Sequence, residues 1–160
     1  MSKLDLFGDV DVAMYEKVCK HLKKHEDDNN ITVDINSTGG CVYDALAIAA
    51  KLRSSGKQVT TRVFGSCFSA TTLISACGHD RRMHSSSWWM LHDARSSWKG
   101  NIVESEHNLR QLKREERQWL YLLEEYTNVP AAMFAELSAK SKYLTAKECR
   151  DLGIITEIIY

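Results

Sequence analysis

The sequence predicts a single α/β domain in which helices cover a mostly parallel β-sheet. Strand-like runs of β-branched residues alternate with helical segments from the N-terminus to Gly78, an order typical of a parallel sheet. The chain has 160 residues, which is enough for a core of its own without metals or disulfides. One long segment with helical periodicity, residues 102–128, follows the alternating part.

The first half of the chain is expected to alternate between strands and helices. Apolar and β-branched runs predict strands at residues 4–7, 31–35 and 59–64. Apolar spacing and small-residue composition predict helices at residues 12–22, 42–52 and 70–77.

The second half is expected to contain three further short strands, at residues 81–83, 88–92 and 154–159. A serine turn lies between the first two. Pro130 is expected in the first turn of a helix. Thr145 and Glu148 form a predicted capping box for a short helix at residues 149–152.

The long helix carries a narrow apolar stripe, made of Leu109, Leu112, Trp119, Leu123 and Tyr126. Glu116 interrupts this stripe, and the remaining face is charged. Two interpretations stay open: the charged face is a solvated surface of this domain, or the stripe faces another subunit.

Composition and charge argue against several classes of partner. The formal net charge is zero, so no basic field is expected to attract nucleic acid. No apolar run reaches the roughly 18 residues of a membrane span, and the N-terminus lacks an apolar signal core, so we expect a cytoplasmic protein without membrane contact. The five cysteines include no C-x-x-C pair and the six histidines lack metal-ligand spacing, so neither a disulfide framework nor a metal site is expected.

Ser69 is the first candidate catalytic residue. It lies where a predicted strand, a turn at Gly65 and a predicted helix meet, so its hydroxyl is expected beside unpaired backbone N–H groups and the positive end of a helix dipole. Such a place suits a nucleophile and the oxyanion that it generates. The alternative is that Ser69 only caps the helix.

Two further features are expected at the same edge of the sheet, because the carboxyl ends of parallel strands meet there. One is the turn at residues 36–40, whose two glycines expose N–H donors and let backbone approach a substrate closely. The other is His92 at the end of an apolar strand, since histidine is suited to general base catalysis near neutral pH. The alternative is that His92 is an ordinary exposed histidine.

Five segments in this order resemble the Clp protease proteolytic subunit (ClpP) family and its phage-encoded head maturation proteases. The first two are residues 35–40 (INSTGG), which resemble the family's I-N-S-P-G-G, and residues 42–48 (VYDALAI), which resemble V-x-D-G/A-x-A-I of the phage branch. The next two are Gly65 with Ser69, which match the nucleophile turn G-x-x-x-S, and residues 90–92 (MLH), which match M-I-H. The last is residues 143–155, which resemble the signature F-L/M-S/T-A-x-E-A-x-x-x-G-L-I-D that closes the family's sequence. The resemblance runs from about residue 6 to residue 159.

The resemblance implies a ClpP/crotonase-like fold with the long helix at an assembly face. It implies a serine endopeptidase that works through an acyl-enzyme, with Ser69 as nucleophile and His92 as general base. The backbone N–H groups of Gly40 and Ala70 would form the oxyanion hole. The implied partners are a peptide or protein substrate and further copies of the chain, and no metal or other cofactor is implied.

The family's catalytic aspartate is replaced by Ser141. We expect Ser141 to accept the histidine N–H in its place, giving a slow Ser-His-Ser arrangement. Two alternatives stay open: an acid from elsewhere substitutes, or the enzyme is weak or inactive. The candidate acids are Asp93, Asp44 and Glu136, and Asp93 is expected to point away because it directly follows His92 on a strand.

Other departures concern assembly. The chain begins almost at its first predicted strand, so the family's N-terminal axial segment is expected to be absent or short, and neither an ATPase unfoldase partner nor a need for ATP is expected. Residues 93–100 hold one glycine where the family has a glycine-rich strand, so stacked heptameric rings are not assumed. Oligomerisation is still expected, because the long helix and Trp88, Trp89 and Trp98 offer apolar surface unless these tryptophans pack in the core.

Three other functions stay open. The first is a catalytically silent ClpP-like subunit that acts by assembly or binding, which the missing aspartate favours. The second is a crotonase-type acyl-CoA enzyme, because that fold shares the paired turns. The third is an enzyme that uses Cys67 as its nucleophile.

Overall fold

Within the residues that the computed structural model describes, which are 1–95, 97 and 99–160, seven strands form one sheet. Five of them pair in parallel in the order β1-β2-β3-β4-β7. Their bounds are β1 Ser2–Phe7, β2 Asn30–Ser37, β3 Gln58–Phe68, β4 Asp80–His84 and β7 Glu157–Ile159. The predicted α/β fold with a mostly parallel sheet is confirmed.

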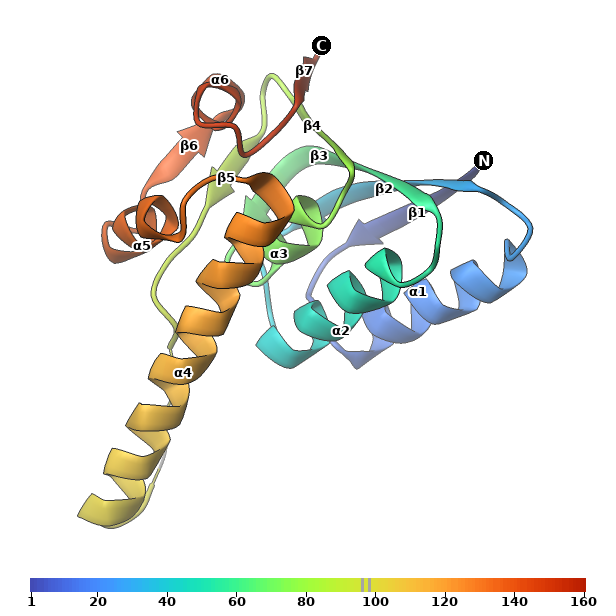
Figure 1. The fold of residues 1–160 in the computed structure, drawn as a ribbon. Coiled ribbons are helices and arrows are strands. Elements are labelled where there is room, and N and C mark those ends of the chain that lie inside the picture. The colour runs from blue at the N-terminus through green and yellow to red at the C-terminus, as the bar shows by residue number, and fades with distance from the viewer. Residues whose placement is uncertain (96, 98) are drawn as a thin grey trace.

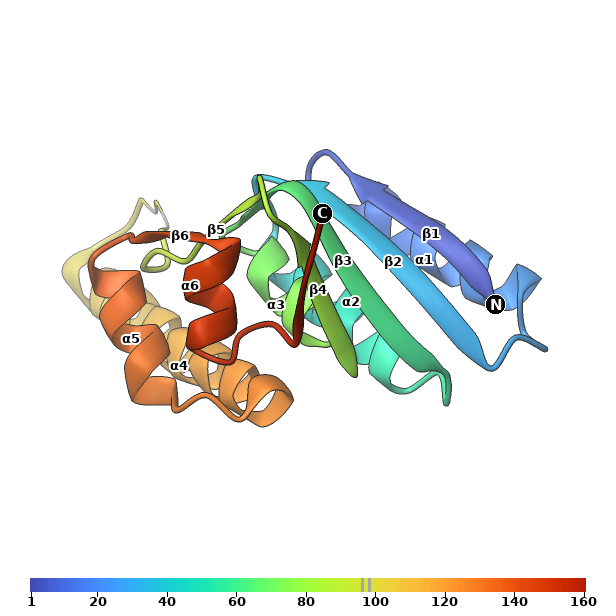
Figure 2. The same cartoon turned by 90° about the horizontal axis from the view of Figure 1, so that it is seen from above.

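Three helices lie on one face of these strands (Figures 1 and 2): α1 Val12–Lys24, α2 Val42–Arg53 and α3 Thr71–Ala76. Each of them connects one parallel strand to the next, as such strands require. Their inward side chains, among them Val18, Ile48 and Leu73, are fully buried in the core beneath the sheet. All three helices are close to their predicted bounds.

The strand β3 runs further than the sequence predicts. A turn was expected at Gly65, but the strand continues through this glycine to Phe68, and its register with β2 shifts at this point. Gly65 has a φ of 90°, and Asn36 Oδ1 accepts hydrogen bonds from the Ser66 N–H (3.0 Å) and the Ser66 hydroxyl (2.9 Å). The prediction of a turn was wrong because a bulge, held by a side-chain amide, lets the strand go on.

Beyond the bulge, β3 pairs in parallel with β5 (Trp88–Met90), and β5 pairs with β6 (Tyr143–Thr145) in the antiparallel sense. The sequence does not predict β6, and it predicts β5 as two residues longer, up to His92. The pairing attaches the segment before His92 to the end of β3 that precedes Ser69.

The last two helices begin at or next to the residues that their N-terminal signals indicate. Pro130, expected in the first turn, is the N-cap residue of α5 (Ala131–Ala139) and so directly precedes it. The predicted capping box is present at α6 (Ala146–Asp151), where the Glu148 carboxylate accepts from the Thr145 N–H at 2.9 Å and the Thr145 hydroxyl accepts from the Glu148 N–H at 3.3 Å.

The long helix α4 (Ile102–Thr127) has two different environments. Trp119 and Leu123 in its C-terminal half are buried in the core, whereas Ile102 and Val103 at its start are 79% and 71% exposed. Figure 1 shows that this end projects from the rest of the domain. The apolar stripe therefore packs on its own core at one end, and subunit contact at the other end stays a prediction.

In the described part of the chain, no helix combines the length and apolarity of a membrane span.

The tryptophans differ in their surroundings. Trp89 is buried in the core, while Trp88 is 46% exposed. Trp98 lies outside the described residues. Between Trp88 and Trp89, only Trp88 offers apolar surface to a partner.

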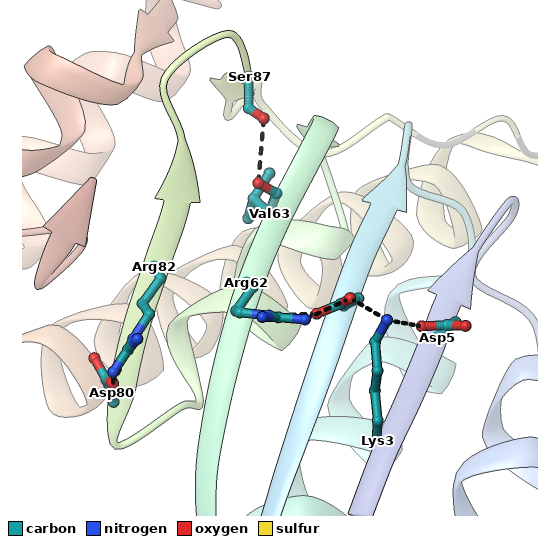
Figure 3. A network of polar contacts seen from close by, with 8 residues as sticks. Lys3, Asp5, Arg62, Val63, Asp80, Arg82 and Ser87 are labelled. Carbon is teal, nitrogen blue, oxygen red and sulfur yellow. Dashed lines mark hydrogen bonds and ion pairs between the residues drawn. The ribbon is translucent and has the colours of Figure 1, made fainter. Parts of the chain in front are cut away.

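Lys3, Asp34 and Arg62 lie side by side on the face of the sheet away from α1, α2 and α3 (Figure 3). Arg62 donates to both oxygens of Asp34, at 2.7 and 2.9 Å, and Lys3 Nζ lies 3.0 Å from Oδ2. The Asp34 side chain is 5% exposed. Burial alone raises the pKa of Asp34, but the hydrogen bonds from Arg62 and Lys3 outweigh it and hold this pKa below its usual value.

Asp34 is predicted to make the stability of the fold pH-dependent. A depressed pKa in the folded state contributes stability above the unfolded value of about 3.9, and this contribution is lost as the pH falls through the folded pKa. We expect Asp34→Asn to lower the free energy of unfolding by about 2 kcal/mol at neutral pH and to flatten its decline in acid.

Urea denaturation at a series of pH values between about 7 and about 2.5 measures this free energy of unfolding. Asp5→Asn is the matched control, because Asp5 faces Lys3 at 3.6 Å but is 48% exposed. An equal loss in both variants would contradict the assignment to Asp34.

Candidate active site

A cavity of about 510 Å³ brings together four of the residues singled out in the sequence: Gly40, Ser69, Ala70 and His92. They come from the turn after β2, the junction of β3 and α3, and the segment after β5. Side chains of α4 form the opposite wall, including Leu112, Glu115, Glu116, Trp119 and Leu120. The volume lies in the range of small-molecule and peptide side-chain sites.

Ser69 occupies a strained junction between strand and helix. Its φ is 54°, a left-handed value that residues other than glycine seldom adopt. Its N–H donates to the Met90 carbonyl at 2.8 Å, and its carbonyl accepts from the Thr72 N–H at 3.0 Å. The Ser69 hydroxyl makes no hydrogen bond to any described residue, and α3 has no side-chain cap. The alternative that Ser69 caps the helix is therefore wrong, because its backbone rather than its hydroxyl joins the first turn.

The turn after β2 lies directly against Ser69. Gly39 has a φ of 109°, and a methyl group on it would lie 2.8 Å from Ser69 Cβ and 3.0 Å from the Phe68 carbonyl oxygen. The Ser37 hydroxyl accepts from the Gly39 N–H (3.1 Å) and from Thr71 Oγ1 (2.8 Å), so it joins this turn to α3. Only glycine combines this φ with this contact distance.

Two residues that line the cavity, Gly40 and Ala70, have backbone N–H groups without an acceptor among the described residues. The turn is paired to Val10 by hydrogen bonds that use the Gly39 carbonyl and the Cys41 N–H, and none of the described bonds uses the Gly40 N–H. The Ala70 N–H also donates to none of the described residues. Free N–H groups on both sides of a serine are what an oxyanion site needs.

His92 follows the end of β5 and is half-buried. Its Nδ1 lies 2.7 Å from the carbonyl oxygen of Asp93. A carbonyl only accepts, so this contact favours a proton on Nδ1, which in a neutral ring makes Nε2 the acceptor. Ser69 and His92 line the same cavity, although no hydrogen bond joins their side chains among the described atoms.

A sequence model of the Clp protease family matches residues 2–160. The chain belongs to the Clp protease family. It is 30% identical over 159 residues to ATP-dependent Clp protease proteolytic subunit 3 of Rhodococcus jostii (strain RHA1). The matched region covers 96% of this chain and 79% of that relative. It is 26% identical over 141 residues to ATP-dependent Clp protease proteolytic subunit 1 of the same strain, and this matched region covers 86% of this chain and 64% of that relative.

Membership of the Clp protease family agrees with the family that the sequence motifs indicate. It removes the basis of the crotonase-type alternative, which rested on the paired turns alone. Nothing in these matches assigns the chain to the phage-encoded branch, which stays a prediction.

In this Clp protease family member, Ser141 is not brought to the cavity. It is exposed, has a φ of 46°, and its N–H donates to the Ser138 carbonyl at 2.9 Å. The buried Ser138 lines the cavity instead, and its hydroxyl donates to Asp93 Oδ1 at 2.8 Å. Sequence reasoning missed Ser138, although it lies one helical turn before Ser141 and could have been considered with it.

The three acids named as substitutes differ in position. Asp93 was expected to point away from the site, but β5 ends at Met90, so strand alternation does not apply to it. Its carboxylate contacts Ser138. Asp44 and Glu136 do not line the cavity, and Glu136 pairs with Lys140 at 2.5 Å.

Cys67 does not have the properties of a nucleophile. It is fully buried, and burial raises the pKa of its thiol to about 12. The alternative that Cys67 attacks a substrate is therefore wrong, because a buried thiol stays protonated near neutral pH. Among the described residues, no cluster of three or more histidines, cysteines or acids could hold a metal ion.

The contact between Gly39 and Ser69 yields a stability prediction. Gly39→Ala is expected to destabilise the fold by about 3 kcal/mol or more, since the methyl group adds a clash to the cost of a left-handed alanine. Gly56→Ala is the matched control, because Gly56 has a φ of 73° with nothing within 4 Å of the added methyl group. It is expected to cost about 1 kcal/mol.

Guanidinium denaturation of both variants measures the difference. Equal losses would show that the turn can move away from Ser69, contrary to the close approach described above.

Proposed function

We propose that the chain is a serine endopeptidase of the ClpP type that cleaves peptide bonds through an acyl-enzyme. Support comes from one observation above all: Ser69, His92, Gly40 and Ala70 line the same cavity, and among the described residues neither the Ser69 hydroxyl nor the Gly40 and Ala70 N–H groups have a hydrogen-bond partner. This is the set of groups that acyl transfer requires.

In the proposed reaction, Ser69 Oγ attacks the substrate carbonyl carbon while His92 Nε2 takes the hydroxyl proton. The N–H groups of Gly40 and Ala70 donate to the oxygen that becomes negative. The tetrahedral intermediate collapses, the peptide C–N bond breaks, and the leaving amine takes the proton from His92. Water then attacks the ester with His92 as base, which releases the acid and restores Ser69.

Approach of Ser69 Oγ to Nε2 is part of this proposal. Catalytic hydrogen bonds are often long in a free enzyme and tighten only when substrate is bound. The hydrolysis consumes no nucleotide and needs no metal or other cofactor.

The proposed substrate is a peptide segment of a protein. The cavity wall is apolar at Leu112, Trp119 and Leu120 and acidic at Glu115 and Glu116. Tyr43 donates to Glu115 at 2.6 Å, which links α2 to α4 across the site. The hydrogen bonds that Glu115 accepts from Tyr43, the larger cause, and from Gln111 lower the pKa of Glu115. Glu115 therefore carries a negative charge on the α4 side of the cavity near neutral pH.

The remaining sequence-based expectations belong to the same proposal. We propose assembly into a homo-oligomer through the exposed first half of α4, action without an unfoldase, and a cytoplasmic setting, which is that of the host if the chain is phage-encoded. Nucleic acid and membrane partners are not part of the proposal.

Replacement of the nucleophile tests the proposal directly. Ser69→Ala is expected to lower the hydrolysis of unfolded casein and of an acyl-peptide ester by at least about 10³-fold and to abolish labelling by a fluorophosphonate. Ser54→Ala is the control, because Ser54 is an exposed serine at the end of α2 and outside the cavity. Labelling of Ser69→Ala at the wild-type level would exclude Ser69 as the nucleophile.

One observation favours a second candidate, a catalytically silent subunit. In the described part of the chain, no carboxylate is hydrogen-bonded to the His92 ring. Replacement of the aspartate of a Ser-His-Asp triad can lower the rate about 10⁴-fold. A folded wild-type protein that neither turns over the ester nor reacts with the fluorophosphonate would support this second candidate.

A further inference from the structure

The segment that carries His92 is fixed on both sides of the histidine. Before it, the Met90 carbonyl accepts from the Ser69 N–H at 2.8 Å. After it, the Asp93 carboxylate accepts from the Ser138 hydroxyl at 2.8 Å. Neither bond involves the His92 side chain, yet together they set the path of the backbone through residue 92.

The second of these bonds has a consequence for the imidazole. The carbonyl oxygen of Asp93 lies 2.7 Å from His92 Nδ1 and accepts its proton in a hydrogen bond. A histidine used as a base for a serine must keep Nε2 unprotonated, and in a Ser-His-Asp triad the aspartate enforces this tautomer. In this chain a backbone carbonyl is in the position to do so, and a carbonyl directs the ring only while its peptide unit is held still.

Ser138 has the surroundings of a fixed anchor. It is 3% exposed, and its neighbours Phe134 and Leu137 hold α5 against the core with 0% and 5% exposure. Asp93, in contrast, is exposed and lies after the last residue of β5, with no helix or strand between it and residue 99 in the described part of the chain. The hydrogen bond from Ser138 therefore ties this segment to the buried side of α5.

We propose that Ser138 and Asp93 are positioning residues for His92 and take over the role of the family's aspartate. Ser138 holds the Asp93 carboxylate, the Asp93 carbonyl then holds Nδ1–H, and Nε2 is left free toward Ser69. This inference rests on the proposed function for its effect on rate, but the orientation of the ring does not depend on turnover. It differs from the expectation that Ser141 accepts the histidine N–H, because Ser141 lies outside the cavity.

The test compares four variants in ester hydrolysis. Loss of the anchoring bond in Ser138→Ala or Asp93→Ala is expected to lower kcat/KM about tenfold, mostly in kcat, whereas Asp93→Asn keeps an acceptor for the Ser138 hydroxyl and is expected to stay within about twofold of wild type. Ser141→Ala is the comparison, since the sequence-based expectation assigns the loss to it and this inference does not.

The second readout is the ¹⁵N NMR spectrum of the His92 ring, recorded on the Ser69→Ala background so that it needs no activity. The protein that keeps Ser138 is expected to show a proton on His92 Nδ1, whereas the protein with Ser138→Ala is expected to show a mixture of the two tautomers. A merely structural role of Ser138 would lower stability without changing the tautomer.

The outcomes separate this inference from the proposed function. Hydrolysis that depends on Ser69 but not on Ser138 or Asp93 overturns the inference and leaves the peptidase in place. An unchanged tautomer in Ser138→Ala overturns it as well, as does an Asp93→Asn variant as slow as Asp93→Ala. A tautomer that changes with Ser138→Ala on the Ser69→Ala background, together with no hydrolysis by the protein that keeps Ser69, would uphold the inference and remove the peptidase.

Discussion

The site depends on the close approach of two turns, the one after β2 and the one between β3 and α3. Gly39 lies so near Ser69 that a methyl group would meet its Cβ at 2.8 Å. This contact is possible because the parallel strands β2 and β3 end at the same edge, and because the bulge at Gly65 carries β3 past its neighbour. Ser69 is thereby fixed in its left-handed conformation by surroundings that leave its hydroxyl free.

The close approach of these two turns also decides which backbone N–H groups are left to stabilise a negative charge. The Ser37 hydroxyl and Val10 bind the Gly39 N–H, the Gly39 carbonyl and the Cys41 N–H, and the Gly40 N–H has no acceptor among the described residues. The same holds for the Ala70 N–H, on the other side of Ser69. Donors that are already oriented stabilise a developing negative charge without reorganising when the charge forms. The cost is local backbone strain, which the buried residues of α3 and β3 hold in place.

The histidine has a weaker form of support. A neutral carbonyl can fix the tautomer of an imidazole, but it stabilises the imidazolium less than a carboxylate in the same position would. Under the proposed function, this arrangement keeps the geometry for acyl transfer and gives up part of the electrostatic stabilisation. Such a balance fits a slow peptidase, which is the form of activity that the replacement of the family aspartate by Ser141 led us to expect.

The sequence by itself determined the α/β fold, most helix bounds, and the family to which the chain belongs, because periodicity, caps and motif spacing are local properties. Position after a strand singled out the turn at residues 36–40, Ser69 and His92, and the family resemblance added the N–H groups of Gly40 and Ala70. Tertiary structure alone decided that Gly65 is a bulge, that β6 pairs with β5, and that Ser138 rather than Ser141 lines the cavity. These features depend on contacts between residues such as Asn36 and Ser66, or Asp93 and Ser138, which are far apart in the chain, and no local pattern encodes which distant side chain will complete a hydrogen bond.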